Sequence, residues 1–183
     1  NKKKIFVNFP MISLAEQLKK YENKKINQLT FSYFTNGKNT YNDIGIDLLP
    51  HAFSFMLTLL HFRVNNFKII SVEKKINSWK SKIQIKDCVC ICNVKQNIKK
   101  KFSELKFSIN ANKYRRQQYL KGGNYLNILI KNNKKKIQIS NPMANNLKHI
   151  LKNIDNKVAF EHNKKLCIES VKLTEKLINY KKI

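Results

Sequence analysis

The stretch that most constrains the fold is residues 74–105, where three local patterns follow one another. It begins with a basic segment around the single tryptophan, Trp79. Apolar residues then alternate at positions 83, 85, 89 and 91, which is typical of a strand. From Val94 to Leu105, apolar residues recur at three- and four-residue spacing, which predicts a helix. A basic aromatic loop on a strand–helix platform is typical of a polyanion-binding site.

Three cysteines, Cys88, Cys90 and Cys92, lie in the strand of this stretch. Side chains two residues apart in a strand point the same way, which is a poor geometry for disulfide pairing. Their spacing is also tighter than that of zinc-binding cysteines. We therefore expect reduced, buried side chains on one face of a strand, in keeping with a reducing compartment.

The remaining patterns predict helices mixed with strands over one core. Helices are expected over residues 12–25 (with Ser13 as N-cap), 50–62, 144–154 and 174–180. Strands are expected over residues 26–34, 67–72, 106–110, 125–130, 136–139, 158–160 and 166–170, with a polar loop over 111–124. No repeat or linker divides the chain. The sequence therefore predicts one α+β domain over residues 1–183, a mostly antiparallel sheet with helices packed on one face, and a basic N-terminal extension over residues 1–10.

The charge balance indicates a polyanionic partner. The chain carries 37 Lys and Arg against 11 Asp and Glu, a net charge of +26, while 42% hydrophobic residues are enough for a folded core. Nucleic acid is the first expected partner, because a polyanion relieves self-repulsion and releases counterions. An anionic membrane surface is the second, but residues 48–62 are too short to span a bilayer and too uniformly apolar for a surface helix. The abundance of Lys, Asn and Ile is typical of an A/T-rich genome and weakens the charge argument.

Motifs of enzymes are missing from the sequence. It has no phosphate-binding P-loop, dinucleotide fingerprint, zinc-protease motif or nucleophile elbow. Asp43, Asp47 and His51 are four residues apart and would align on a helix, but Gly45 and Pro50 are expected to interrupt it. No catalytic residue, metal ligand or cofactor is therefore predicted, and the chain is not expected to be an enzyme.

Two segments combine cations with aromatic side chains, as RNA-binding sites do. In the first, lysines would contact phosphate and Trp79 would stack on a base or sugar. In the second, residues 111–125, the arginine guanidinium groups would bind phosphate beside tyrosines and a glycine pair. For each, the alternative is an ordinary solvated hairpin or surface loop.

Several short motifs, in order, resemble one family: the 5S rRNA-binding protein numbered five of the large ribosomal subunit. They are Leu18, Lys19, Ile26 and Leu29, at the spacing of the family's first helix; the Leu57-Thr58-Leu59-Leu60 segment; the basic loop at 73–80; the strand–helix at 85–105; Gly123-Asn124-Tyr125; and 166–178 with Thr174 and Glu175. The protein numbered six of the large subunit is a second resemblance, limited to the C-terminal half through Lys113-Tyr114-Arg115 and Asn141-Pro142-Met143.

The first resemblance implies a structural protein of the central protuberance of an organellar ribosome, in a mitochondrion or alternatively a plastid. It would hold 5S rRNA or neighbouring large-subunit rRNA, contact P-site tRNA and neighbouring ribosomal proteins including one of the small-subunit head, and bind no membrane. The implied rRNA-binding residues are Arg115, Arg116, Lys121, Gly123, Asn124, Tyr125, Lys19, Lys20, Lys24 and Lys25, and the implied tRNA or bridge loop is Lys74, Lys75, Trp79 and Lys80. A non-ribosomal RNA-processing factor is the alternative of another class.

Overall fold

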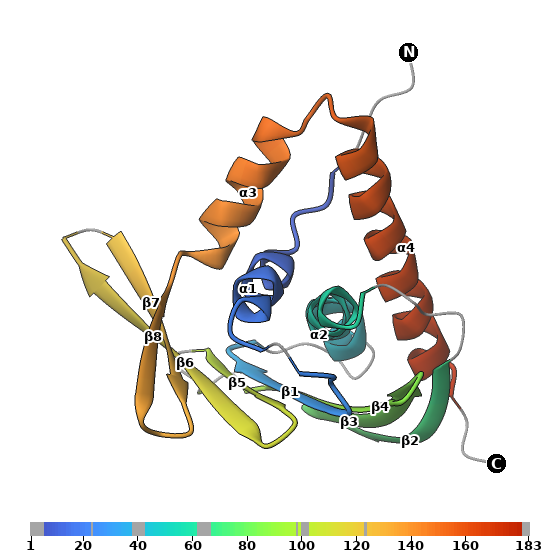
Figure 1. Cartoon of the computed structure of the whole chain (residues 1–183). Coiled ribbons are helices and arrows are strands. Elements are labelled where there is room, and N and C mark those ends of the chain that lie inside the picture. Colours follow the sequence, from blue (N-terminus) through green and yellow to red (C-terminus); the bar gives the residue numbers. More distant parts are fainter. Residues whose placement is uncertain are drawn as a thin grey trace.

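One eight-stranded sheet carries four helices on one of its faces (Figure 1). The computed structural model describes residues 6–22, 24–37, 43–61, 67–97, 99, 103–122 and 124–180. The elements are α1 (Pro10–Lys19), β1 (Gln28–Thr35), α2 (Asp43–Leu59), β2 (Phe67–Lys75), β3 (Ser78–Ile85), β4 (Cys88–Gln96), β5 (Glu104–Ile109), β6 (Asn112–Lys121), β7 (Asn124–Lys131), β8 (Lys135–Ile139), α3 (Pro142–Lys152) and α4 (Lys157–Ile178). The predicted fold class, α+β with a mostly antiparallel sheet and helices on one face, is confirmed.

The strand order places one parallel pair in the middle of an otherwise antiparallel sheet. The order is β2-β3-β4-β1-β5-β6-β7-β8, and β1 pairs with β4 in parallel. The register aligns Gln28 with Val89 at one end and Thr35 with Gln96 at the other. The carboxyl ends of β1 and β4 therefore meet at the same edge of the sheet, beneath the first half of α2.

Alternation along the central strands builds the core. In β4, Cys88, Cys90, Cys92 and Val94 are buried while the residues between them are partly exposed. These side chains and those of β1 face α2, which is buried from Ala52 to Leu59. The cysteines are free thiols, as the sequence predicts, and burial raises the pKa of Cys92 to about 12.

The helix α2 begins seven residues before the predicted start and continues through Pro50. Pro50 has no N–H to donate to the carbonyl of Ile46, one turn earlier. Ile46 is 60% exposed, so water can replace the missing hydrogen bond on that side of the helix. Gly45 is required by packing, since a Cβ there would lie 3.0 Å from ring atoms of Trp79. Proline and glycine therefore do not break this helix, and the expected interruption is wrong.

Three further predictions of secondary structure are wrong. The helix expected after Val94 is replaced by the end of β4 and, at Leu105, by β5. The short strands expected at 158–160 and 166–170 belong to α4, where Leu166, Ser170, Leu173 and Leu177 are buried at helical spacing. The loop expected over 111–124 is largely β6. In the first two cases a short apolar pattern fitted two periods, and tertiary packing selected the other one. In the third, polar residues are extended because β6 pairs with both β5 and β7.

The N-terminal helix α1 begins before the predicted cap. It begins at Pro10, in the first turn where a missing N–H costs nothing, and Phe9 at the N-cap makes no side-chain hydrogen bond. Ser13 therefore lies inside the helix. Across the part of the chain that the structure describes, no helix is both long and apolar enough to span a bilayer.

Glu22 ties the segment after α1 to the β6–β7 hairpin. Its carboxylate accepts hydrogen bonds from Asn112 Nδ2 at 3.0 Å and from the Tyr114 hydroxyl, and it pairs with Lys131 Nζ at 2.8 Å. Burial disfavours the ionised carboxylate, but the hydrogen bonds from these three donors outweigh it, so the pKa of Glu22 is lowered. Because the Glu22 side chain is only 7% exposed, this network is screened little by solvent.

We expect Glu22→Gln to lower the free energy of unfolding by about 1–3 kcal/mol, because it weakens hydrogen bonds to a buried charge. A lowered pKa in the folded state stabilises the protein above the unfolded value of 4.5, and this contribution is lost as the pH falls below it. Urea unfolding at neutral and acidic pH measures both effects. The difference in unfolding free energy between the wild type and Glu22→Gln should shrink at acidic pH. Glu16→Gln is the control: Glu16 forms an ion pair with Lys19, but its side chain is 51% exposed, so this variant should change stability little. A difference that is constant with pH would contradict the ionised state of Glu22.

Candidate functional site

The predicted tRNA or bridge loop is a β-hairpin, and its tryptophan belongs to the core. Residues 74–80 form the end of β2, a two-residue turn and the start of β3. Trp79 is 2% exposed and packs against Gly45, so its ring has no exposed face for stacking. Lys74 Nζ lies 4.9 Å from the ring centroid and donates to the carbonyl of Ile178. Lys75 pairs with Glu73 at 3.0 Å, and Lys80 is exposed.

The cations predicted near α1 do not form one cluster. Lys19 pairs with Glu16 at 2.9 Å and Lys25 pairs with Asp87 at 3.0 Å. Lys20 and Lys24 are exposed. Their assignment to RNA came from the ribosomal resemblance and has no further support in this arrangement.

The structure separates the two arginines of the second predicted RNA segment. They are consecutive residues of β6, so Arg115 faces away from the helices and Arg116 faces toward them. Tyr125 is 60% exposed at the start of β7. Lys121 and Asn124 lie at the facing ends of β6 and β7, and Gly123 lies outside the described residues. A single arginine fork beside a glycine turn is therefore not formed.

The structure instead brings together polar side chains that are far apart in the sequence. They lie on the helix face, where β1 and β4 end beneath α2, and come from four elements. They are Tyr33 on β1, Asp47 and His51 on α2, Gln96 on β4 and Arg116 on β6. In open α/β sheets, ligands bind outside the carboxyl ends of the parallel strands, and this cluster likewise lies at the carboxyl ends of β1 and β4.

Gln96 connects the end of β4 to the first half of α2. The residue is 3% exposed, and its Nε2 donates to Asp47 Oδ2 over 3.1 Å. Its Oε1 is buried without a hydrogen-bond partner among the described residues. A Cβ at Gly37 would approach Nε2 to 2.9 Å, so the glycine lets the chain pass close to this amide. A buried amide with an unsatisfied oxygen is uncommon in proteins and calls for a structural or functional explanation.

His51 lies one helical turn after Asp47. Burial lowers the pKa of His51, and the carboxylate of Asp47 opposes this only partly, so the imidazole is neutral at neutral pH. Its Nδ1 is buried without a hydrogen-bond partner in the described part of the chain, while the residue as a whole is half-buried. The Tyr33 and His51 rings pack nearly perpendicular to each other, with centroids 6.1 Å apart. Nε2 is therefore the ring nitrogen that can meet a substrate.

Arg116 is the cation of the cluster. Tyr33 pairs with Leu105 on β5, and Lys106 pairs with Arg115, so Arg116 continues the same row across the helix face. Burial lowers the pKa of Arg116 and the neighbouring Tyr33 opposes the change, but an arginine remains charged. A neutral imidazole, a carboxylate, an amide and a guanidinium can together orient a hydroxyl-bearing molecule and accept a proton from it. No set of three His, Cys, Asp or Glu residues suited to a metal ion occurs in the described residues.

The sequence contained one signal for this site. The spacing of Asp47 and His51 would align them on a helix, and they do share one. Tyr33 and Gln96 lie in short strands without a motif, and only the parallel pairing of β1 and β4 brings them to α2.

Comparisons with known proteins find a similar fold in several solved structures of oxidoreductases. No family model and no curated protein matches the sequence. Among solved structures, a dehydrogenase from Clostridium difficile is 13% identical, with a TM-score of 0.63 over 94% of this chain and 60% of that chain. A Gfo/Idh/MocA family oxidoreductase from Vibrio cholerae is 10% identical, with a TM-score of 0.57 over 91% and 58%. A 3-ketoreductase from Actinomadura kijaniata, in complex with TDP-benzene and NADP, is 8% identical, with a TM-score of 0.56 over 96% and 60%. The chain thus spans about 60% of the length of these structures, and the likeness shows the fold.

These neighbours contradict the ribosomal interpretation. Structures that share the fold are dehydrogenases and reductases, so the resemblance to the ribosomal protein numbered five was wrong. The same structures contradict the structural role in the central protuberance and the rRNA, tRNA and ribosomal-protein partners. They also contradict the expectation that the chain is not an enzyme. The motifs behind the resemblance were short, and a basic, Lys-rich composition matches such motifs easily.

Proposed function

We propose that this sheet carries the substrate-binding part of an NAD(P)-dependent oxidoreductase that acts on a hydroxyl or ketone of a sugar-like substrate. The observation that carries the proposal is the cluster of His51, Asp47 and Gln96 at the carboxyl ends of the parallel strands. The fold neighbours support it, because they include dehydrogenases and a 3-ketoreductase bound to NADP and a TDP-linked molecule.

The cluster suits the proton-transfer half of such a reaction. Oxidation of a secondary alcohol to a ketone removes a hydride and a proton. The residues of this cluster would accept the proton. Nε2 of neutral His51 accepts it from the substrate hydroxyl, and the Asp47 carboxylate stabilises the resulting imidazolium. Arg116 would bind a neighbouring oxygen of the substrate, and the buried Gln96 amide would hold the Asp47 carboxylate in position. In the direction of reduction, the imidazolium returns the proton to the forming alcohol.

The described sheet lacks the features that bind a nicotinamide nucleotide. Dinucleotides bind to doubly wound parallel sheets, at a glycine-rich turn that leads into a helix. Here β1 and β4 form the parallel pair of an otherwise antiparallel sheet, and the sequence has no dinucleotide fingerprint. The proposal therefore assigns nucleotide binding to a region outside this sheet, in keeping with the greater length of the neighbours.

Binding of sugars to the chain tests the proposal directly. We would label the histidine rings for NMR and titrate the protein with free sugars and with nucleoside-diphosphate sugars. A binding substrate should shift the His51 ring signals and leave those of the exposed His149 in place. Because the proposal assigns the nucleotide to a region outside this sheet, sugar binding is the readout that decides it. Absence of sugar binding across the panel would overturn the proposal.

A further inference from the structure

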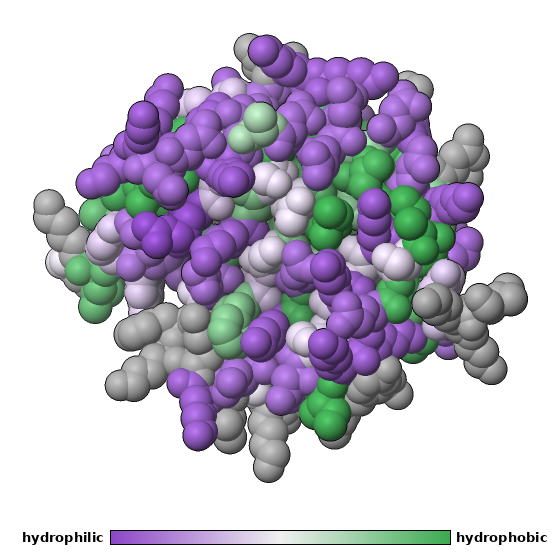
Figure 2. Space-filling view, turned by 90° about the horizontal axis from the view of Figure 1, so that it is seen from below, coloured by the Kyte–Doolittle hydropathy of each residue, from purple (hydrophilic) through white to green (hydrophobic). Residues whose placement is uncertain are grey.

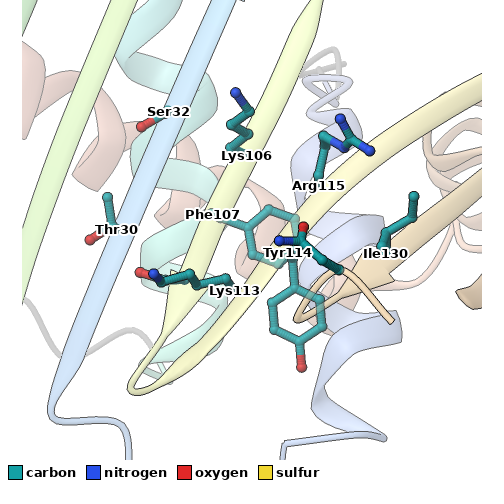
Figure 3. A pocket seen from close by; sticks show the side chains of 10 residues that line it. Thr30, Ser32, Lys106, Phe107, Lys113, Tyr114, Arg115 and Ile130 are labelled. Carbon is teal, nitrogen blue, oxygen red and sulfur yellow. The ribbon is translucent and has the colours of Figure 1, made fainter. Parts of the chain in front are cut away.

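The face of the sheet that carries no helix has a pocket of its own. Figure 2 looks onto this open face and shows mostly hydrophilic surface with separate hydrophobic spots. Between β1, β5 and β6 the surface is hollowed by a pocket of about 410 Å³. Figure 3 shows its side chains arising from neighbouring strands. The pocket and the cluster around His51 lie on opposite faces of the sheet, so they are separate sites.

The strand register arranges the pocket side chains in two rows. One row runs Thr30, Ser108, Lys113 across β1, β5 and β6, since Thr30 pairs with Ser108 and Ser108 with Lys113. The next runs Ser32, Lys106, Arg115 in the same way. Paired side chains on one face lie about 5 Å apart, so each row offers hydroxyl and cationic donors to a single group. All six residues line the pocket.

The cations in these rows are incompletely neutralised. Lys106 lies directly opposite Arg115, and like charges at paired positions destabilise a sheet. Glu104 pairs with Lys106 at 2.6 Å, but no described acidic side chain pairs with Lys113 or Arg115. Ser32 Oγ accepts a hydrogen bond from Asn93 at 3.2 Å, so its own hydrogen can still be donated. The pocket therefore offers positive charge and donors that an anion would satisfy.

We propose that this pocket binds a small phosphorylated molecule, a phosphate or diphosphate ester. A guanidinium and two ammonium groups around hydroxyl donors form the environment that phosphate oxygens need. A diphosphate would reach both rows, with Arg115 and Lys106 on one phosphate and Lys113 on the other. The volume suits a small ligand, and the flanking Ile130 gives its organic part an apolar contact.

Calorimetric titration of the whole chain with inorganic pyrophosphate, at about 0.15 M salt, tests the proposal. Arg115→Gln and Lys113→Gln should each weaken binding about tenfold, because each removes a charge-assisted hydrogen bond. Both side chains are exposed, so the variants should fold normally. Lys82→Gln is the matched control, since Lys82 is an exposed cation of β3 outside the pocket, and it should change the affinity less than about twofold.

Three results would overturn the proposal. The first is absence of pyrophosphate binding, and the second is equal weakening by Lys82→Gln and the pocket variants, which would mean diffuse attraction by the whole surface. The third is binding of single-stranded RNA that depends on Arg115 and is tighter than pyrophosphate binding, which would make the ligand a polymer. Because His51 lies on the other face, the outcome is independent of the proposed oxidoreductase function.

Discussion

Trp79→Ala is expected to lower the free energy of unfolding by about 3–5 kcal/mol, the largest effect on stability of any substitution considered. The ring is 2% exposed and fills the space between β3 and the first turn of α2, with Gly45 against it. Removing it leaves a cavity beneath α2 that the glycine cannot fill. The aliphatic chain and ammonium of Lys74 also lose their packing against the ring.

Chemical denaturation followed by circular dichroism measures this effect, because Trp79 is the chain's only tryptophan and its fluorescence is lost in the variant. Ile76→Ala is the matched control. Ile76 lies in the turn of the same hairpin and is 72% exposed, so its truncation should change stability by no more than about 0.5 kcal/mol. Equal stability of Trp79→Ala and the wild type would mean that the ring is not part of the core and would restore the exposed loop that the sequence predicts.

In the enzyme assayed together with its nucleotide-binding region, His51→Gln is expected to lower kcat/KM by about 100- to 10,000-fold, the range that general acid–base catalysis supplies. Glutamine keeps much of the side-chain volume but cannot take a proton from the substrate. The substitution should leave the unfolding midpoint nearly unchanged, because His51 Nδ1 makes no hydrogen bond to the described residues. His149→Gln, at an exposed position of α3, should retain full activity. A small effect of His51→Gln on kcat/KM would remove His51 from the proton-transfer role.

The pH dependence separates this role from a structural one. His51 acts as a base only when neutral, so kcat/KM for alcohol oxidation should fall as the pH drops through its pKa, which burial lowers below the ordinary 6.5. Asp47 raises this pKa, so Asp47→Asn should move the acidic limb to lower pH. An acidic limb that does not move in Asp47→Asn would contradict the pairing of these two residues.

The sequence by itself determined the class of fold and most of the strands. Partial alternation in residues 26–34 predicted β1 closely, and the two segments on either side of the turn at 131–135 predicted β7 and β8 closely. The period-two cysteines correctly predicted a buried strand face. Local pattern is sufficient there because burial on a sheet depends on which face a residue occupies, and that follows from its position along the strand.

Only the tertiary structure decided which elements meet. Apolar spacing after Val94 fitted a helix, but pairing with β1 and β3 holds the chain extended to Gln96. The adjacent Arg115 and Arg116 were predicted to bind phosphate together, but the sheet directs them to opposite faces. Arg115 faces the pocket between β1, β5 and β6, and Arg116 faces the cluster around His51. The candidate active site depends on a parallel pairing between strands about sixty residues apart, Gln28 with Val89. Such a contact is stabilised by the folded core as a whole, so no local segment of the sequence encodes it.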